Sequence, residues 1–265
     1  MFDIASFIRL LQTGWLGRRF WHFRKLDSTN RHLQDIPGRR LSHGLVCIAD
    51  EQTGGKGQFG RSWFSAPNEN LTFTIVLKPS SNSGLQLFSL AVMLALCKTV
   101  RAMVHGECNI KWPNDLQIAG KKAAGLLTEC RYNGKHLDRM FLGLGINVNQ
   151  VRFPDAIRDK ATSLVRHTNG QTVDRSLLLA VFLNRLEPYI YQVEDGDMDL
   201  IRSINRNIQG YGRWVSILVD GKREETPVKI LGINEFGFLM VLTANDDIKT
   251  FKHEQVRIES PPSDS

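Results

Sequence analysis

The sequence predicts an α+β fold that ends in a small β domain. Apolar residues alternate with threonines over residues 71–77, which is typical of a half-buried strand, and residues 85–104 predict an almost wholly apolar helix. From about residue 208 the pattern changes to four or five short alternating runs separated by turn sequences. We therefore expect a domain of mixed helices and strands over residues 1–207 and a small SH3-like β domain, or β-barrel, over residues 208–265.

The composition is that of a folded protein with reduced cysteines. The 265 residues are 42% hydrophobic and 23% charged, and no run approaches the length of a membrane span. Arg9 interrupts the apolar N-terminus and no cleavage site follows, so a signal peptide is not expected and a cytoplasmic location is favoured. Four cysteines stand singly, without the spacing of a zinc or redox motif, and are expected to be core residues: Cys47, Cys97, Cys108 and Cys130.

The N-terminal stretch predicts a short helix within residues 1–17, ending near residues 14–17, and then a strand over residues 20–26. Ser28 and Thr29 follow, and their hydroxyls are placed to cap the next helix. A helix N-terminus with free hydroxyl and N–H groups also suits a small polar ring, so capping and ligand binding can coexist.

A glycine-rich loop, with glycine at positions 54, 55, 57 and 60, follows an apolar strand predicted over residues 45–49. Its glycines allow backbone N–H groups to approach an anion closely, although such loops are often only flexible connections. Lys56 and Arg61 lie inside the loop and Trp63 lies just beyond it, which favours a site for a triphosphate and a purine. The alternative is that Trp63 is an ordinary core residue.

A hairpin is predicted at residues 111–125. Pro113 has no N–H for a sheet and biases the residue before it to extended geometry, so a strand ends here and a tight turn follows. The hairpin turns at Ala119-Gly120 and places Asp115 and Lys122 on opposite arms. These are candidate functional charges; the alternative is a turn residue and a solvated lysine.

Two further strands are predicted, over residues 123–130 and 141–149. Bulky residues take one face of the second strand, whereas Gly143, Gly145 and Asn147 lie on the other. A face without side chains lets a group approach the backbone, and we favour a ligand because asparagine supplies donors and acceptors beside it. A bend or bulge is the alternative.

The last predicted helix covers residues 173–193. Its apolar face consists of Leu177, Leu178, Val181, Phe182 and Leu186. Turns are predicted in the β domain at Asp220-Gly221 and residues 235–237, and residues 259–265 predict a polar, disordered tail.

Four motifs resemble the signatures of biotin protein ligases, the family that includes bacterial biotin repressor/ligases and holocarboxylase synthetases. In chain order they are residues 27–30 (DSTN), 51–63 (EQTGGKGQFGRSW), 111–125 (KWPNDLQIAGKKAAG) and 143–147 (GLGIN). The resemblance implies a catalytic domain like those of class II aminoacyl-tRNA synthetases and biotin synthetases, with an SH3-like C-terminal domain.

The resemblance also implies the residues of the site. It implies Lys122, Lys56 and Asp115 as catalytic residues, and names no metal ligand. The residues implied for biotin are Ser28, Thr29, Asn30, Gln52, Gly55, Lys56, Gly125 and Gly143. Those implied for ATP are Lys56, Gln58, Arg61, Trp63, Lys111, Asn114, Asp115, Lys122 and Asn147.

The implied activity is that of an ATP-dependent biotin–protein ligase. Such an enzyme forms biotinyl-5′-AMP from biotin and ATP, with Mg²⁺ carrying part of the triphosphate charge, and transfers biotin to a lysine of a biotin carboxyl carrier protein or domain. A lipoate-type protein ligase, with similar chemistry, is the alternative within the same class.

The net charge of +7 suggests an alternative from a different class, a nucleic-acid-binding or repressor module. The charges are scattered, however, without a basic run or an interleaved aromatic stripe. The first motif begins at Asp27, which leaves too little chain for an N-terminal DNA-binding domain. We therefore expect neither DNA nor a membrane as a partner, and a homodimer is compatible with the sequence.

Overall fold

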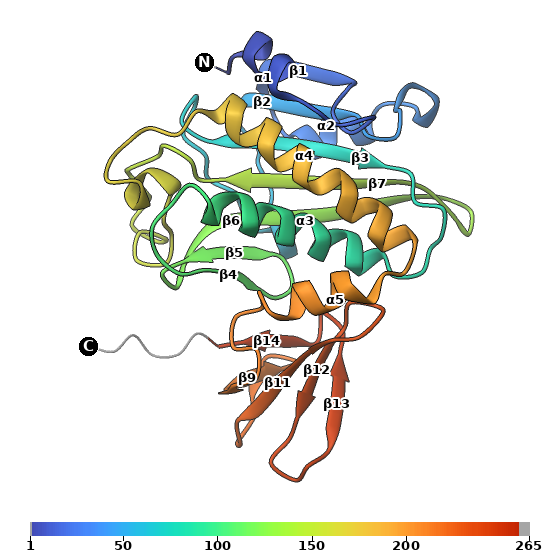
Figure 1. Ribbon diagram of the computed structural model, residues 1–265, viewed down its shortest axis with the longest axis vertical. Coiled ribbons are helices and arrows are strands. Elements are labelled where there is room, and N and C mark those ends of the chain that lie inside the picture. Colours follow the sequence, from blue (N-terminus) through green and yellow to red (C-terminus); the bar gives the residue numbers. More distant parts are fainter. Residues whose placement is uncertain (1, 260–265) are drawn as a thin grey trace.

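The computed structural model describes residues 2–259 and contains one large sheet, helices on its two faces and a small β domain at one end (Figure 1). The large sheet has seven strands in the order β1-β2-β3-β7-β6-β5-β4. Only β1 and β2 run parallel within it. The strands are β1 Phe20–Leu26, β2 Val46–Gln52, β3 Leu71–Leu77, β4 Cys108–Lys111, β5 Asp115–Ile118, β6 Lys121–Asn133 and β7 His136–Ile146. The predicted strands at 20–26 and 71–77 and the turn at Ala119-Gly120 are confirmed.

Helices cover both faces of this sheet. The long helices α3 and α4 contact each other over one face, above the main core, and α2 covers the other (Figure 1). The helices are α1 Ile4–Leu10, α2 Thr29–Gln34, α3 Leu85–Arg101, α4 Arg175–Glu194 and α5 Met198–Asn205, with short 3₁₀ turns at Gly38–Arg40, Gln58–Gly60 and Leu164–His167. No helix within residues 2–259 is long and apolar enough to cross a membrane.

The expectation that residues 71–77 form a half-buried strand is wrong. All seven residues of β3 are buried. One face of β3 packs into the main core, and the opposite face carries Thr72, Thr74 and Val76. α2 and the residues around it cover that second face, with Val76 packed in the smaller core cluster beside Leu33. Alternation in the sequence therefore reflects two different buried environments here, one apolar and one polar.

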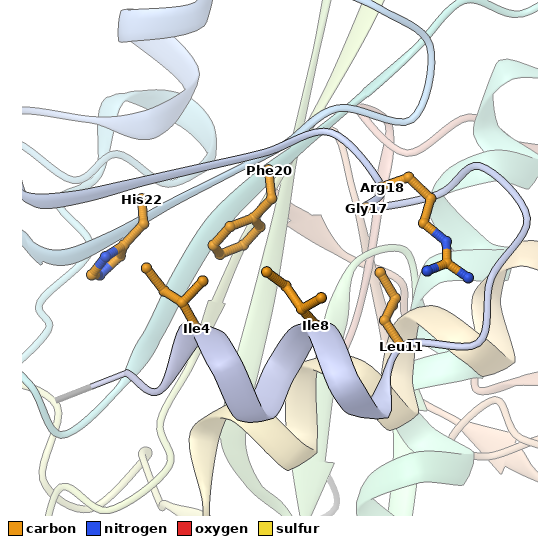
Figure 2. A pocket seen from close by; sticks show the side chains of 7 residues that line it. All are labelled: Ile4, Ile8, Leu11, Gly17, Arg18, Phe20 and His22. Atoms are coloured by element: carbon orange, nitrogen blue, oxygen red, sulfur yellow. The ribbon is translucent and has the colours of Figure 1, made fainter.

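The N-terminal helix is shorter than expected. α1 begins after Asp3, whose carboxylate accepts a hydrogen bond from the Ser6 N–H, and ends at Leu10 instead of near residues 14–17. Between α1 and β1 lies a hollow of about 410 Å³, into which apolar side chains of the helix point (Figure 2). It is lined by Ile4, Ile8, Leu11, Gly17, Arg18, Phe20 and His22, none of which is a predicted site residue.

The β domain contains more strands than the sequence predicts. Its strands form a three-stranded sheet β10-β9-β14 and a four-stranded sheet β13-β12-β11-β8. They are β8 Trp214–Val215, β9 Ile217–Val219, β10 Lys222–Arg223, β11 Val228–Ile233, β12 Leu239–Leu242, β13 Ile248–Phe251 and β14 Val256–Ile258. The turns at Asp220-Gly221 and residues 235–237 are confirmed. Of the predicted disordered tail, residues 260–265 lie outside the described residues.

Three local expectations are corrected by the structure. Leu177, predicted on the apolar face of α4, is exposed, because it lies on the same outward face of the helix as the exposed Pro188 and Tyr191. Cys130 is also exposed, since β6 extends there beyond its pairing with β5, whereas the other three cysteines are buried. Helix α5 has no counterpart among the predicted elements.

Candidate functional site

The central hairpin brings Asp115 and Lys122 together. Lys122 Nζ lies 2.7 Å from Asp115 Oδ1, and both side chains remain partly open to solvent, at 38% and 25% exposed. A shift of register between Leu116 and Gln117 places an extra residue in β6, as in a β-bulge. The Lys122 side chain lies over Gly125, where a Cβ would come within 3.1 Å of the ammonium. The absence of a side chain at Gly125 thus leaves room for the lysine to lie against the strand beside Asp115.

Trp63 fills the space over the glycine face of β7. A Cβ at Gly145 would clash with the indole, and Gly125 lies beneath the edge of the same ring. Lys122 Nζ lies 5.5 Å from the ring centroid, close enough for a cation–π contact. The indole Nε1 is buried and has no hydrogen-bond partner within residues 2–259. The glycines that the sequence marks as cleared for a ligand therefore accommodate a side chain of the candidate site.

A polar network lies on the α2 side of the sheet. Gln52 Oε1 accepts hydrogen bonds from the Thr29 N–H at 2.8 Å and from its hydroxyl at 3.1 Å. The Thr74 hydroxyl contacts Thr29 Oγ1 at 2.8 Å and donates to Asn30 Oδ1 at 2.6 Å. Gly143 completes the network, because any Cβ there would overlap the Asn30 carboxamide. These residues, all predicted for biotin except Thr74, are brought together by the fold.

Two members of this network are not identified by the sequence. Thr74 is buried although its alternating strand suggests a solvent-facing threonine. Glu129, on β6, accepts a hydrogen bond at 2.8 Å from Nδ2 of Asn30, which lies on α2 far away in the sequence. The expected capping by the Ser28 hydroxyl is wrong. Ser28 occupies the N-cap position of α2 without a side-chain cap hydrogen bond, and its backbone N–H donates to the Asp27 carboxylate at 2.7 Å.

The glycine-rich loop is anchored at its base. The Trp63 N–H donates to Gly55 O at 2.9 Å, and Lys56 and Ser62 form an isolated bridge. Gly55 is buried against Trp63 and Gln52, where a Cβ would meet the Trp63 carbonyl at 2.9 Å.

The side chains of the loop are not tied to the hairpin. Lys56 and Arg61 are exposed, and Gln58 is half-buried. In the part of the chain that the structure describes, no hydrogen bond or ion pair joins these three to the Lys122–Asp115 pair. The two predicted groups of cations are therefore separate in this structure.

Two of the remaining residues predicted for ATP, Asn114 and Asn147, hold backbone in place. Asn114 Nδ2 donates to Leu126 O at 2.6 Å, and Asn147 Nδ2 donates to Thr162 O at 3.0 Å. Lys111 lies opposite Asp115 in the hairpin register. Burial lowers the pKa of Lys111, Asp115 opposes this change, and the positive charges of Lys122 and Arg257 add to it.

The chain resembles known proteins over most of its length. A sequence model of the biotin/lipoate A/B protein ligase family matches residues 22–147. The bifunctional ligase/repressor BirA of Bacillus spizizenii is 32% identical over 170 residues, which are 63% of this chain and 52% of that protein. The chain thus matches about half the length of this curated relative. The biotin–[acetyl-CoA-carboxylase] ligase of Mycobacterium tuberculosis is 27% identical over 188 residues, 68% of this chain and 67% of that one.

The fold also matches a solved structure. Biotin protein ligase from Aquifex aeolicus, in complex with biotin and ATP, superposes with a TM-score of 0.79 at 27% identity, covering 91% of this chain and 99% of that one. This confirms the α+β prediction with its small C-terminal β domain. Over residues 22–147 the chain carries a domain of the biotin/lipoate A/B protein ligase family.

Proposed function

We propose that the chain is an ATP-dependent biotin–protein ligase that works in two steps. The biotin carboxylate attacks the α-phosphate of ATP and displaces pyrophosphate, which gives biotinyl-5′-AMP. A lysine amine of a biotin carboxyl carrier protein or domain then attacks the carbonyl of this mixed anhydride, and AMP leaves. The observation that carries the proposal is the Lys122–Asp115 pair at 2.7 Å, held over Gly125 and beside Trp63.

The first step must bring two anions together, which explains the need for cations. Lys122 is partly exposed and can turn its ammonium toward a phosphate or carboxylate oxygen while Asp115 fixes its position. Lys56 and the N–H groups of the glycine-rich loop supply further positive charge from the opposite segment of the chain. Preorganised donors of this kind stabilise the charge that builds up in the transition state.

The second step needs a neutral amine. Asp115 can orient the carrier lysine or accept its proton once Lys122 has moved to the phosphate. Its alternative role is only to hold Lys122. An Asp115→Asn variant separates the two, since loss of proton transfer slows biotin transfer from preformed adenylate, whereas loss of Lys122 positioning slows adenylate formation.

The network around Thr29, Asn30, Gln52 and Thr74 supports biotin as the acid. Its hydroxyl and carboxamide groups offer both donors and acceptors, which match the N–H and C=O groups of a ureido ring. A dithiolane ring has no such groups, so lipoate would offer this network no hydrogen-bond partner. The lipoate-type alternative remains open because the family model covers both kinds of ligase.

Mg²⁺ would enter as its complex with ATP, where triphosphate oxygens supply most of its ligands. Residues 2–259 contain no group of three or more His, Cys, Asp and Glu side chains that could hold a metal ion by themselves. Asp115 is the carboxylate of the candidate site that could add one ligand, once its pair with Lys122 is released.

To test the proposal, the purified protein is incubated with ATP, Mg²⁺, a biotin carrier domain and either biotin or lipoate. The mass of the carrier domain is then measured by mass spectrometry. Biotinylation at one lysine is expected, with lipoylation at least tenfold slower. The converse preference would establish the lipoate alternative. A nucleic-acid module would instead show DNA binding that weakens steeply with salt and no modified carrier.

A further inference from the structure

A contact joins the β domain to the tip of the glycine-rich loop. The guanidinium of Arg257, on β14, lies over the ring of Phe59 at 4.8 Å from its centroid. β14 pairs with β9 and buries Val256 and Ile258, so Arg257 projects from a fixed base. Phe59 itself is 60% exposed and has a left-handed backbone with φ of 57°. An exposed aromatic residue in a backbone conformation that non-glycine residues rarely adopt needs a contact to hold it.

The other contacts of the loop tip stay within the loop. The Gly57 N–H donates to Arg61 O at 2.7 Å, and the Arg61 N–H donates to Gln58 O at 3.3 Å. Across residues 2–259, no hydrogen bond or ion pair links residues 57–61 to another element. The stacking on Arg257 therefore bridges the two domains at the tip, while the base is fixed separately through Gly55 and Trp63.

We propose that Arg257 is a positioning residue, which holds the glycine-rich loop over the candidate site by stacking on Phe59. The inference rests on the proposed function, since the loop carries Lys56, which supplies positive charge in the first step, and Arg61, which the resemblance implies for ATP. Through Arg257 the β domain would affect the reaction by positioning the loop, without contacting the substrate itself.

The contact between Arg257 and Phe59 can be tested in the purified protein without substrates. Trypsin cleaves after Lys56 and Arg61, and cleavage of a native loop follows the fraction of time in which it opens. An exposed cation–π contact is worth about 0.5–1 kcal/mol, so Arg257→Ala and Phe59→Leu should each speed cleavage about two- to fivefold, after normalisation to the unfolded chain. The double variant should be no faster than either single one, because both remove the same contact.

Two control variants sharpen this measurement. Phe59→Tyr keeps an aromatic ring and should cleave at the wild-type rate. Arg223→Ala removes another exposed arginine of the β domain, which pairs with Glu259, and should also leave the rate unchanged. Additive effects of Arg257→Ala and Phe59→Leu, or no effect of Phe59→Leu, would overturn the proposal.

A kinetic measurement separates this proposal from the assigned activity. In adenylate formation from biotin and ATP, Arg257→Ala and Phe59→Leu should raise KM for ATP about two- to fivefold, with kcat within twofold and Tm unchanged, and Phe59→Tyr should restore KM. If Arg257→Ala raises KM and Phe59→Leu does not, Arg257 acts through its charge and the stacking role is wrong. If the wild type forms no adenylate while the trypsin results are as expected, the proposed function is wrong, but the positioning of the loop by the Arg257–Phe59 contact is supported.

Discussion

Lys122 Nζ lies 2.7 Å from Asp115 Oδ1, across two strands of one hairpin and over the bare backbone of Gly125. We expect Lys122→Ala to slow formation of biotinyl-adenylate by about 10²-fold or more, the scale found when one preorganised charge-stabilising donor is lost. Single-turnover formation of the adenylate measures this. Lys121→Ala, which removes an exposed charge from the adjacent residue, is the matched control and should react normally. A near wild-type rate for Lys122→Ala would refute the assignment.

Gly145 is required because Trp63 lies on its backbone. Gly145→Ala should destabilise the protein by about 1–3 kcal/mol, as expected for overpacking, and displace the indole. Urea unfolding measures the free energy. The loss should shrink by at least about 1 kcal/mol when the same change is made in a Trp63→Ala background, since the clash partner is gone. Gly14→Ala, whose Cβ would meet its nearest atom at 3.4 Å, is the control. Equal losses in both backgrounds would show that Trp63 does not occupy this place in solution.

Lys111 should be neutral over a wider pH range than an ordinary lysine. Burial, with Lys122 and Arg257 nearby, lowers its pKa in the folded protein, so the neutral amine becomes populated at lower pH. Acetylation of Lys111, followed by peptide mass spectrometry against pH, should therefore show a midpoint below that of N-acetyl-lysine amide. ATP or pyrophosphate should move the midpoint upward, because an anion favours the ammonium. A midpoint at or above that of the free amide contradicts the burial of this group.

The domain boundary predicted at residues 207 and 208 stays a prediction, and the structure sets what its test should show. The Trp112 indole N–H donates to Gly237 O at 3.3 Å, and the hydrophobic core continues from the large sheet into the β domain. A chain ending at Asn207 should unfold cooperatively but at a lower Tm. Loss of the β domain exposes core side chains that pack against it, and each large apolar side chain that is exposed costs about 1.5–3 kcal/mol. A chain ending at Gln209, which keeps its N–H bond to Ile110 O, should be the more stable of the two. Calorimetry without a cooperative transition would place the boundary elsewhere.

The sequence predicts elements well where a short local pattern decides them. Residues 20–26 and 71–77 are confirmed as strands, and Ala119-Gly120 as the hairpin turn, because alternation and turn residues act locally. Contacts between residues that are distant in the chain leave no such pattern in the sequence. The burial of Thr74 depends on α2, which precedes it by about forty residues, and Glu129 on β6 bonds Asn30 on α2, about a hundred residues earlier.

The same distinction between local patterns and long-range contacts applies to the candidate site. The motifs identify Lys122 and Asp115, but their contact depends on the register shift after Leu116, which no periodicity predicts. The glycine face of β7 is predicted correctly as a cleared surface. Its occupants, Trp63 and Asn30, come from segments far away in the chain, so the sequence cannot name them.

The resemblance to biotin protein ligases implies a loop richer in arginine than this one, and the difference should affect how the adenylate is held. By that resemblance Lys56 stands for an arginine, and Gln58 and Phe59 stand where further basic residues often occur. Arginine offers carboxylate and phosphate a planar fork, lysine a point charge and glutamine no charge. Each charge-assisted bond that is missing would be worth about 1.5–3 kcal/mol if made in full, which is one to two orders of magnitude in retention.

Gln58→Arg tests this effect of charge directly. Gln58 is half-buried at the start of the 3₁₀ turn Gln58–Gly60, and its side chain makes no hydrogen bond within the described residues 2–259. The substitution therefore removes no side-chain hydrogen bond, and the added guanidinium should slow dissociation of preformed biotinyl-adenylate by about tenfold or more, because it adds one charge-assisted bond to the phosphate. Release of labelled adenylate measures the rate, and Gln58→Met, similar in length and uncharged, is the matched control. Equal dissociation from Gln58→Arg and Gln58→Met would show that the loop's charge has no part in keeping the intermediate.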